Sequence, residues 1–486
     1  MTTAITIGMI IIYVAIMMGI GVYTARQTRS VSDFVLGSHS VGSWLTAFAY
    51  GTSYFSAVVF IGYAGQFGWT YGVSAAWVGV GNALLGSLLA WIVLGRRTRI
   101  MTQSLGAKTM PEYFEKRWNS KGLKIAAALI VFVFLIPYTA SVYNGLSRLF
   151  NMAFQIESEG AYKIIIIVMA LLTAIYVILG GYAATAINDF IQGIVMLIGI
   201  AAVVICAIQN QGGLTSALAA LGEIEVNGKT NTLNSVFGPD PLNLLGVVIL
   251  TSLGTWGLPQ MIHKFYAIKS ENDIKKGAVI STVFALIVAG GSYLLGGFDR
   301  LFCTLTEDGS GKTVISTLSN GKPDFDAMIP SLLHTALPDI LIGLVVVLVL
   351  SASMSTLSSL VLTSSSTLTI DLIKPNLKKC SDKKEMLIMR VLIAVFLVIS
   401  VLLAFNKNAS ISTLMSYSWG ALAGAFLGPF MYGLFSRKIT KPAVWTSFIL
   451  GIGLTLVHMF LFGFGWNPEL SKAAASLPLN LASPIN

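Results

Sequence analysis

Long apolar segments recur along this chain from its first residues almost to its end. Each of about twelve segments is long enough, at 1.5 Å of rise per residue, to cross the roughly 30 Å hydrocarbon core of a bilayer as a helix. They cover residues 5–23, 42–67, 72–95, 124–150, 162–180, 186–208, 241–263, 277–298, 328–370, 387–405, 411–436 and 442–464. Because 55% of the 486 residues are apolar and only 11% are charged, we predict an all-α integral membrane protein.

Basic residues gather in alternate loops between these segments. They occur at Arg26 and Arg29 and in the loops 96–124, 264–276, 374–390 and 437–441. Cytoplasmic loops of membrane proteins carry such an excess of Lys and Arg, so topology explains the net charge of +10 and no nucleic-acid partner is expected. We predict a multi-pass protein of the cell (plasma) membrane, surrounded by the lipid bilayer, with its N-terminus outside.

The two ends of the chain carry extra elements. Segment 5–23 has no positive charge before it and is too long for the apolar region of a signal peptide, so we interpret it as an uncleaved spanning helix. Segment 442–464 is an additional helix, and the tail at 465–486 is polar or weakly apolar. This tail is either a plain extension or the remnant of a truncated last helix, and the whole chain, 1–486, is interpreted as one transmembrane domain.

Two apolar segments are interrupted by small and polar residues at mid-membrane depth. The interruptions read GTSYFSA at 51–57 and GTWGLP at 254–259. Irregular backbone at this depth is stable only where protein or a water-filled cavity satisfies the freed N–H and C=O groups, and paired broken helices mark the binding site of inverted-repeat transporters. A Gly/Pro kink relieved by packing is the alternative for either interruption.

A stripe of hydroxyl groups lies within the apolar segment 328–370. Ser351, Ser355, Ser358 and Ser359 fall at i, i+4, i+7 and i+8, so on a helix they share one face. Such oxygens suit a hard monovalent cation. The alternative is that each hydroxyl bonds to the carbonyl four residues before it or joins two helices.

Asp189 is the carboxylate best placed to face the interior of the bundle. It lies near the start of segment 186–208, where a buried acid is costly unless it is paired or binds an ion. An acid in the first turn of a helix, stabilised by the helix dipole, is the alternative. Neither a nucleophile–base pair nor a metal-binding constellation is evident in the spans, so the sequence does not predict an enzyme.

Four separated motifs give the chain a resemblance to the sodium:solute symporter family. They are Met354-Ser355-Thr356-Leu357-Ser358, Asn188-Asp189-Phe190-Ile191-Gln192, Asp33-Phe34-Val35-Leu36-Gly37-Ser38 and Gly257-Leu258-Pro259. The resemblance implies a LeuT-type fold of two inverted five-helix repeats, here 42–208 and 241–436, with flanking helices. It also implies a monomer that imports a small organic solute together with sodium by alternating access.

The resemblance implies sodium ligands at particular residues of this chain. The main site implies the backbone carbonyls of Thr52, Phe55 and Ala352 and the hydroxyls of Ser355 and Thr356. A second site, present in members that resemble the sialic acid transporters, implies Asp189, Ser355, Ser358 and Ser359. One sodium ion is therefore expected at the main site and a second at this other set.

The solute is less narrowly defined by the resemblance. The chain is similar to the sodium/pantothenate and sodium/proline symporters, but Tyr54 and Thr251 depart from the proline pattern and Leu135 replaces the arginine of sialic acid transporters. An amino acid, a pantothenate-like carboxylate or a similar metabolite is expected, and no Arg or Lys is evident that would hold a strongly anionic one. The candidate solute-binding residues are Ser53, Tyr54, Ser56, Gln66, Tyr138, Thr251, Trp256, Pro259 and Tyr417. Two alternatives stay open: a proton-coupled symporter of the same fold, with Asp189 as the proton carrier, and a solute sensor that transports nothing.

Overall fold

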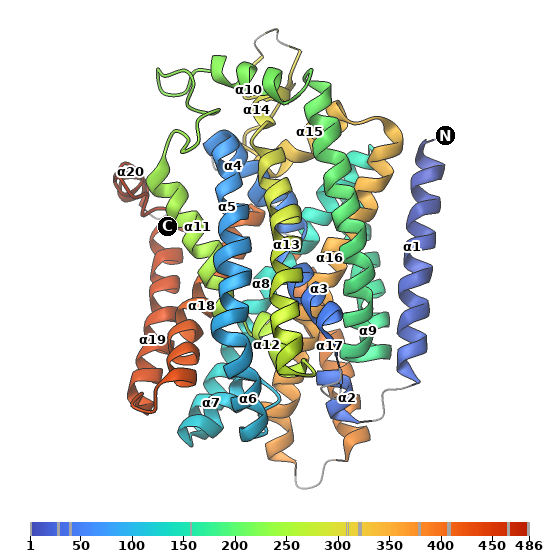
Figure 1. Ribbon diagram of the computed structural model, residues 1–486, viewed down its shortest axis with the longest axis vertical. Coiled ribbons are helices and arrows are strands. Elements are labelled where there is room, and N and C mark those ends of the chain that lie inside the picture. Colours follow the sequence, from blue (N-terminus) through green and yellow to red (C-terminus); the bar gives the residue numbers. More distant parts are fainter. Residues whose placement is uncertain are drawn as a thin grey trace.

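The computed structural model is an elongated bundle in which most helices run along one axis (Figure 1). It describes residues 2–26, 30–37, 41–155, 158–307, 309, 311–318, 323–377, 381–405, 410–463 and 467–483. Parts of two predicted elements, residue 464 and the tail residues 465–466 and 484–486, lie outside these ranges, as do Ser38 of a family motif and Arg29 of a basic loop.

Helices account for most of the described chain. The α-helices are α1 (Thr2–Ala25), α2 (Val31–Leu36), α3 (Ser43–Tyr54), α4 (Ala64–Tyr71), α5 (Ala76–Gly81), α6 (Arg96–Leu105), α7 (Met110–Trp118), α8 (Lys121–Phe154), α9 (Glu159–Asn210), α10 (Leu214–Glu223), α11 (Pro241–Leu253), α12 (Pro259–Ala267), α13 (Glu271–Gly296), α14 (Asp299–Phe302), α15 (Met328–Ala336), α16 (Asp339–Thr367), α17 (Asp382–Ala404), α18 (Ile411–Phe435), α19 (Lys441–His458) and α20 (Pro468–Ala475). Tighter or wider helical segments are η2 (Val58–Tyr63), η3 (Gly72–Ala75), η4 (Asn82–Leu89), η5 (Trp91–Gly95), η6 (Gly254–Gly257), η7 (Phe325–Ala327), η8 (Leu368–Ile373), η9 (Lys374–Asn376) and η10 (Met459–Gly463). Two short parallel strands, β1 (Cys303–Thr304) and β2 (Thr313–Val314), pair in a loop.

Several of these helices are long and apolar enough to cross a membrane. By length and composition, eight helices of the described residues qualify, or nine if the bent pair Pro241–Gly257 and Pro259–Ala267 forms one span. This count takes Val58–Leu105 and Glu159–Asn210 once each, although each contains a glycine that leaves helical geometry, Gly72 (φ 63°) and Gly181 (φ 56°). These two glycines and the 25-residue α18 account for the difference from the twelve segments expected.

Both predicted interruptions are breaks in the helical backbone. α3 ends at Tyr54, and Phe55 is extended (φ −95°, ψ 125°) before η2 begins. α11 and η6 are followed by an extended Leu258 (φ −83°, ψ 120°), and α12 leaves at an angle of 50°. The two breaks are in contact, because the Tyr54 hydroxyl donates a 3.1 Å hydrogen bond to the carbonyl of Thr251.

The second broken span is longer than the sequence predicted. α12 continues to Ala267, so Lys264 belongs to this helix and not to the basic loop in which the sequence analysis placed it. Its side chain is only 2% exposed. The basic loop therefore begins after α12, and a cationic side chain lies inside the bundle.

The predicted basic loops meet at one end of the bundle. Arg96 pairs with Glu271 at 2.6 Å, joining the first residue of α6 to the first residue of α13. Arg117 of α7 donates to the carbonyl of Ser436, 2.7 Å away, beyond the end of α18. The loops that the sequence analysis assigned to one side of the membrane are therefore neighbours in space.

Glycines bring the backbones of three helices into direct contact. A carbon added as Cβ at Gly68 of α4 would lie 2.0 Å from the backbone of Gly296 of α13, and one at Gly79 of α5 would lie 2.4 Å from Gly290. No side chain larger than hydrogen fits these positions without moving a backbone. We call the contact formed by Gly68, Gly79, Gly290 and Gly296 the glycine interface.

Candidate sodium and solute sites

The break after α3 and the hydroxyl stripe of α16 meet in the interior. The Thr356 hydroxyl donates to the carbonyls of Thr52 (3.3 Å) and Phe55 (3.2 Å). The Ser355 hydroxyl donates to the carbonyls of Thr52 (3.2 Å) and Ala352 (2.9 Å). The structure therefore brings together all five residues predicted for the main sodium site.

The local sequence explains why these oxygens are available. Phe55 is extended, so the helix stops and the carbonyls of Thr52 and Phe55 accept bonds from α16 hydroxyls. All five residues are at most 1% exposed. A group of neutral oxygens shielded from water suits a monovalent cation, which loses its hydration shell and regains oxygen ligands from carbonyls and hydroxyls.

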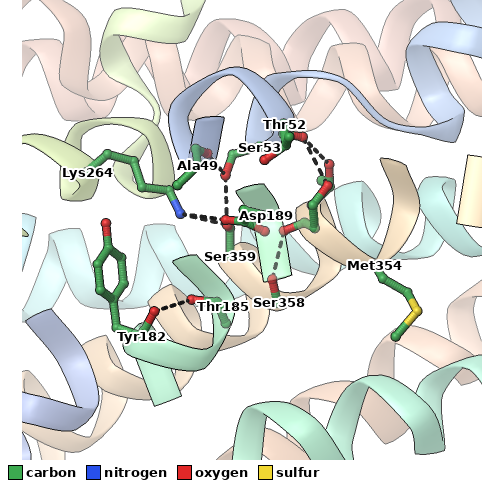
Figure 2. A network of polar contacts seen from close by, with 12 residues as sticks. Ala49, Thr52, Ser53, Tyr182, Thr185, Asp189, Lys264, Met354, Ser358 and Ser359 are labelled. Atoms are coloured by element: carbon green, nitrogen blue, oxygen red, sulfur yellow. Dashed lines mark hydrogen bonds and ion pairs between the residues drawn. The ribbon is translucent and has the colours of Figure 1, made fainter. Parts of the chain in front are cut away.

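A second polar group lies beside the first, and a lysine is at its centre (Figure 2). Lys264 of α12 donates a 2.9 Å hydrogen bond from Nζ to the Ser359 hydroxyl, and Nζ is 3.8 Å from Oδ2 of Asp189. The Ser53 hydroxyl lies 2.8 Å from that of Ser359 and also donates to the carbonyl of Ala49. Four elements, α3, α9, α12 and α16, thus contribute to one buried cluster.

The four residues predicted for a second sodium site make contacts with different partners. Asp189 and Ser359 face the lysine. The Ser358 hydroxyl donates to the carbonyl of Ser355 at 2.8 Å, one turn before it on the same helix. The Ser355 hydroxyl is directed to the main site.

Aromatic side chains surround the point where the two breaks meet. The rings of Tyr54 and Tyr138 each lie 6.0 Å from the ring of Trp419, between centroids. The Trp256 indole N–H donates to the carbonyl of Leu85 at 3.0 Å. Tyr54 and Tyr138, together with Thr251 through its bond to Tyr54, form the part of the predicted solute site that the structure gathers in one place, whereas Trp256 bonds to η4.

The other predicted solute residues are more dispersed. Ser56 is fully buried just after the first break, and Pro259 is the first residue of α12. Ser53 belongs to the lysine cluster. Gln66 lines a separate cavity of about 390 Å³ near the tail, and the Tyr417 ring packs 6.0 Å from His458 of α19, away from Trp419 and the breaks.

Two residues of these sites were missed by the sequence analysis. Lys264 was taken as the first residue of a basic loop, although Phe265-Tyr266-Ala267-Ile268 continues the apolar pattern after it. Trp419 lies only two positions beyond the predicted Tyr417, and both are aromatic residues of α18. The apolar run after Lys264 was a usable signal, whereas nothing local separates Trp419 from Tyr417.

The two broken helices meet in the middle of a multi-span bundle, and an oxygen cluster lies between the first break and a facing helix. This arrangement defines a LeuT-type secondary transporter. The chain belongs to the sodium:solute symporter family, whose model matches residues 34–451. Its members couple solute transport to sodium and are not enzymes.

Individual relatives agree with this assignment. The chain is 30% identical over 459 residues to the sodium/proline symporter of Staphylococcus aureus (strain JH9), an alignment that covers 92% of this chain and 85% of the relative. Among solved structures, it is similar to a sodium-coupled sialic acid symporter in a substrate-bound, outward-open state. That match has a TM-score of 0.72 at 17% identity and covers 98% of this chain and 93% of the other, so it shows a shared fold.

Proposed function

We propose that this protein imports a small organic solute together with a sodium ion held by the carbonyls of Thr52, Phe55 and Ala352 and the hydroxyls of Ser355 and Thr356. The observation that carries the proposal is the meeting of freed carbonyls at the α3 break with the hydroxyls of α16. A break supplies acceptors that an intact helix would use internally, and the facing helix supplies the remaining oxygens.

The position of this site gives sodium control over the conformation. An ion bound there would join α3 to α16, two elements that are 301 to 304 residues apart at this site and are otherwise linked at it by hydroxyl–carbonyl bonds of 3.2 to 3.3 Å. An ion that binds more tightly when α3 and α16 are joined stabilises the joined conformation. It thereby favours the solute affinity of that conformation. Release of the ion then allows the two elements to separate on the other side.

The solute is an amino acid, a pantothenate-like carboxylate or a similar metabolite. The aromatic group around Tyr54, Tyr138 and Trp419 offers apolar surface with hydroxyl and indole hydrogen-bonding groups. The sequence showed no Arg or Lys that would hold a strongly anionic solute, and the cation nearest these sites, Lys264, is buried beside Asp189. Its ammonium group faces Asp189 and Ser359, so it does not offer a free charge to an anionic solute.

Our proposal also covers the membrane orientation, the oligomeric state and the number of bound ions. We place the protein in the plasma membrane with its N-terminus outside, since the basic loops that meet at one end then face the cytoplasm. It functions as a monomer, because both candidate sites are assembled within one chain. The second sodium ion expected at Asp189, Ser355, Ser358 and Ser359 is not included in this proposal, because Lys264 lies beside two of those residues.

The test is uptake into proteoliposomes under an inward sodium gradient, with a panel of unlabelled metabolites that includes proline and pantothenate as competitors. Thr356→Ala removes a main-site hydroxyl and is expected to abolish sodium-driven uptake. Thr369→Ala is the matched control, because it removes a buried hydroxyl of the same polypeptide stretch that only bonds the carbonyl of Ser365 at 2.8 Å.

Three outcomes would contradict the proposal. Uptake that persists without sodium and follows a pH gradient would favour the proton-coupled alternative. Solute binding without any uptake would favour a sensor. Equal sodium dependence in both variants would remove Thr356 from the site.

A further inference from the structure

We propose that the ammonium group of Lys264 is a built-in cation that takes the place of a second sodium ion, so that the protein binds one sodium ion. This inference rests on the proposed sodium-coupled function. It assigns to Lys264 a role in setting the number of ions bound, a role that the predicted ligand set alone did not include.

The first argument is the position of the ammonium group. Nζ of Lys264 lies 2.9 Å from the Ser359 hydroxyl and 3.8 Å from the Asp189 carboxylate. These are two of the four residues predicted to hold a second sodium ion. The face of the Tyr182 ring, 5.3 Å from Nζ to its centroid, closes another side and attracts a cation.

The second argument is charge. The side chains of Lys264 and Asp189 are 2% and 0% exposed, and an isolated buried charge is strongly unfavourable. One positive charge beside Asp189 balances the cluster. Lysine already supplies that charge, so a sodium ion added between the same groups would leave the cluster with an excess positive charge at a site buried from solvent.

The third argument is the use of the remaining predicted ligands. The Ser355 hydroxyl donates to the carbonyls of Thr52 and Ala352, and the Ser358 hydroxyl donates to the carbonyl of Ser355. Neither hydroxyl is directed to Asp189. Of the predicted set, only Ser359 is left beside Asp189, and its hydroxyl accepts the hydrogen bond from Lys264.

Each of the two broken helices has its own polar connection to α16. At the first break, the main site joins α3 to α16 through Thr52, Ser355 and Thr356. After the second break, Lys264 joins α12 to Ser359 of α16 and to Asp189 of α9. One connection takes an exchangeable ion, and the other uses a cation that is part of the chain.

The experiment measures equilibrium binding of radioactive sodium to the purified full-length protein, with thermal melting in sodium chloride or choline chloride as a second readout. Wild type is expected to bind about one ion. In Lys264→Ala the carboxylate keeps its site but loses its cation, so about two ions are expected, the sodium Hill coefficient is expected to rise from about one towards two, and melting should become more strongly sodium-dependent.

The double variant Lys264→Ala/Asp189→Asn is the control. It removes both charges, so binding is expected to return to about one ion. Two ions bound by the wild type would overturn the inference without any variant, and so would one ion bound by a folded Lys264→Ala protein. A wild type that binds no sodium would instead overturn the proposed function, which keeps the two failures distinguishable.

Discussion

Two contacts inside this bundle are built in opposite ways. At the glycine interface, α13 touches α4 and α5 through backbone atoms, and no side chain separates them at Gly68, Gly79 and Gly296. Where α16 faces α3 and α12, hydroxyls, carbonyls and an ammonium group fill the contact, and we call this the hydroxyl interface. The first contact is held by close van der Waals packing and the second by polar groups.

The difference indicates which contact can open. Backbones packed at glycines in a membrane have no polar group that gains from exposure, so we infer that α4, α5 and α13 move as one body. Groups at the hydroxyl interface can be solvated by water or by an ion when they separate. For the proposed alternating access, we therefore expect the hydroxyl interface to open and close while the glycine interface stays packed.

Gly68→Ala is expected to have the largest effect, because it places a carbon 2.0 Å from the backbone of Gly296. We expect a loss of about 3 kcal/mol of stability or of folded protein altogether, since the clash is with backbone. Thermal melting and the yield of monodisperse protein measure it, and sodium should not restore either.

Gly290→Ala is the matched control for the glycine interface, since a Cβ at Gly290 meets nothing within 4 Å. It should be neutral or slightly stabilising, by up to about 1 kcal/mol of helix propensity. Equal melting temperatures for the two variants would show that the interface tolerates separation.

Ser355→Ala should weaken the hydroxyl interface, because it removes one of the two α16 hydroxyls that donate to the Thr52 carbonyl. We expect sodium affinity to fall by about tenfold to a hundredfold, because a hydrogen-bonding or ion-binding oxygen near a charge contributes about 1.5–3 kcal/mol. Stability without sodium should change less. Sodium titrations followed by thermal melting give both quantities.

Ser353→Ala provides the comparison for that change. Ser353 lies on the same helix and is fully buried, and its hydroxyl has no hydrogen-bond partner among the residues that the structure describes. An identical shift in sodium affinity for the two serines would mean that the main site is elsewhere.

Tyr54→Phe should have the smallest effect of these three. It removes the 3.1 Å hydrogen bond to the Thr251 carbonyl that joins the two breaks, and we expect a loss of about 1 kcal/mol. Tyr143→Phe, at a buried hydroxyl without a partner in the described chain, should cost less. If the two melting temperatures fall equally, the bond between the breaks does not stabilise this conformation.

The sequence predicted which residues of α3 and α16 come together because two independent signals agreed, and sodium binding by them stays a prediction. The interruption at 51–57 and the hydroxyl stripe of 351–359 are each visible in the chain, and the family motif connects them. Their contact in the structure then requires no additional residue. The breaks and most spans were predicted for the same reason, since apolar length and Gly/Pro interruptions are local properties.

What could not be predicted depends on packing between distant segments. The apolar run after Lys264 could have shown that α12 extends past it, but only the three-dimensional fold shows that its side chain lies beside Asp189 and Ser359. Trp419 and Tyr417 lie about 200° apart around α18. The helices beside α18 determine whether Trp419 or Tyr417 is directed towards Tyr54. The sequence of α18 alone does not predict the positions of those helices.

A cation that is covalently part of α12 takes no energy from the sodium gradient. At about −100 mV and a tenfold gradient, one imported sodium ion supplies about 3.7 kcal/mol, enough to concentrate a neutral solute roughly 500-fold, whereas two ions would allow roughly 2 × 10⁵-fold. With Lys264 held beside Asp189, the protein would reach a lower solute concentration ratio but use only one sodium ion for each solute imported.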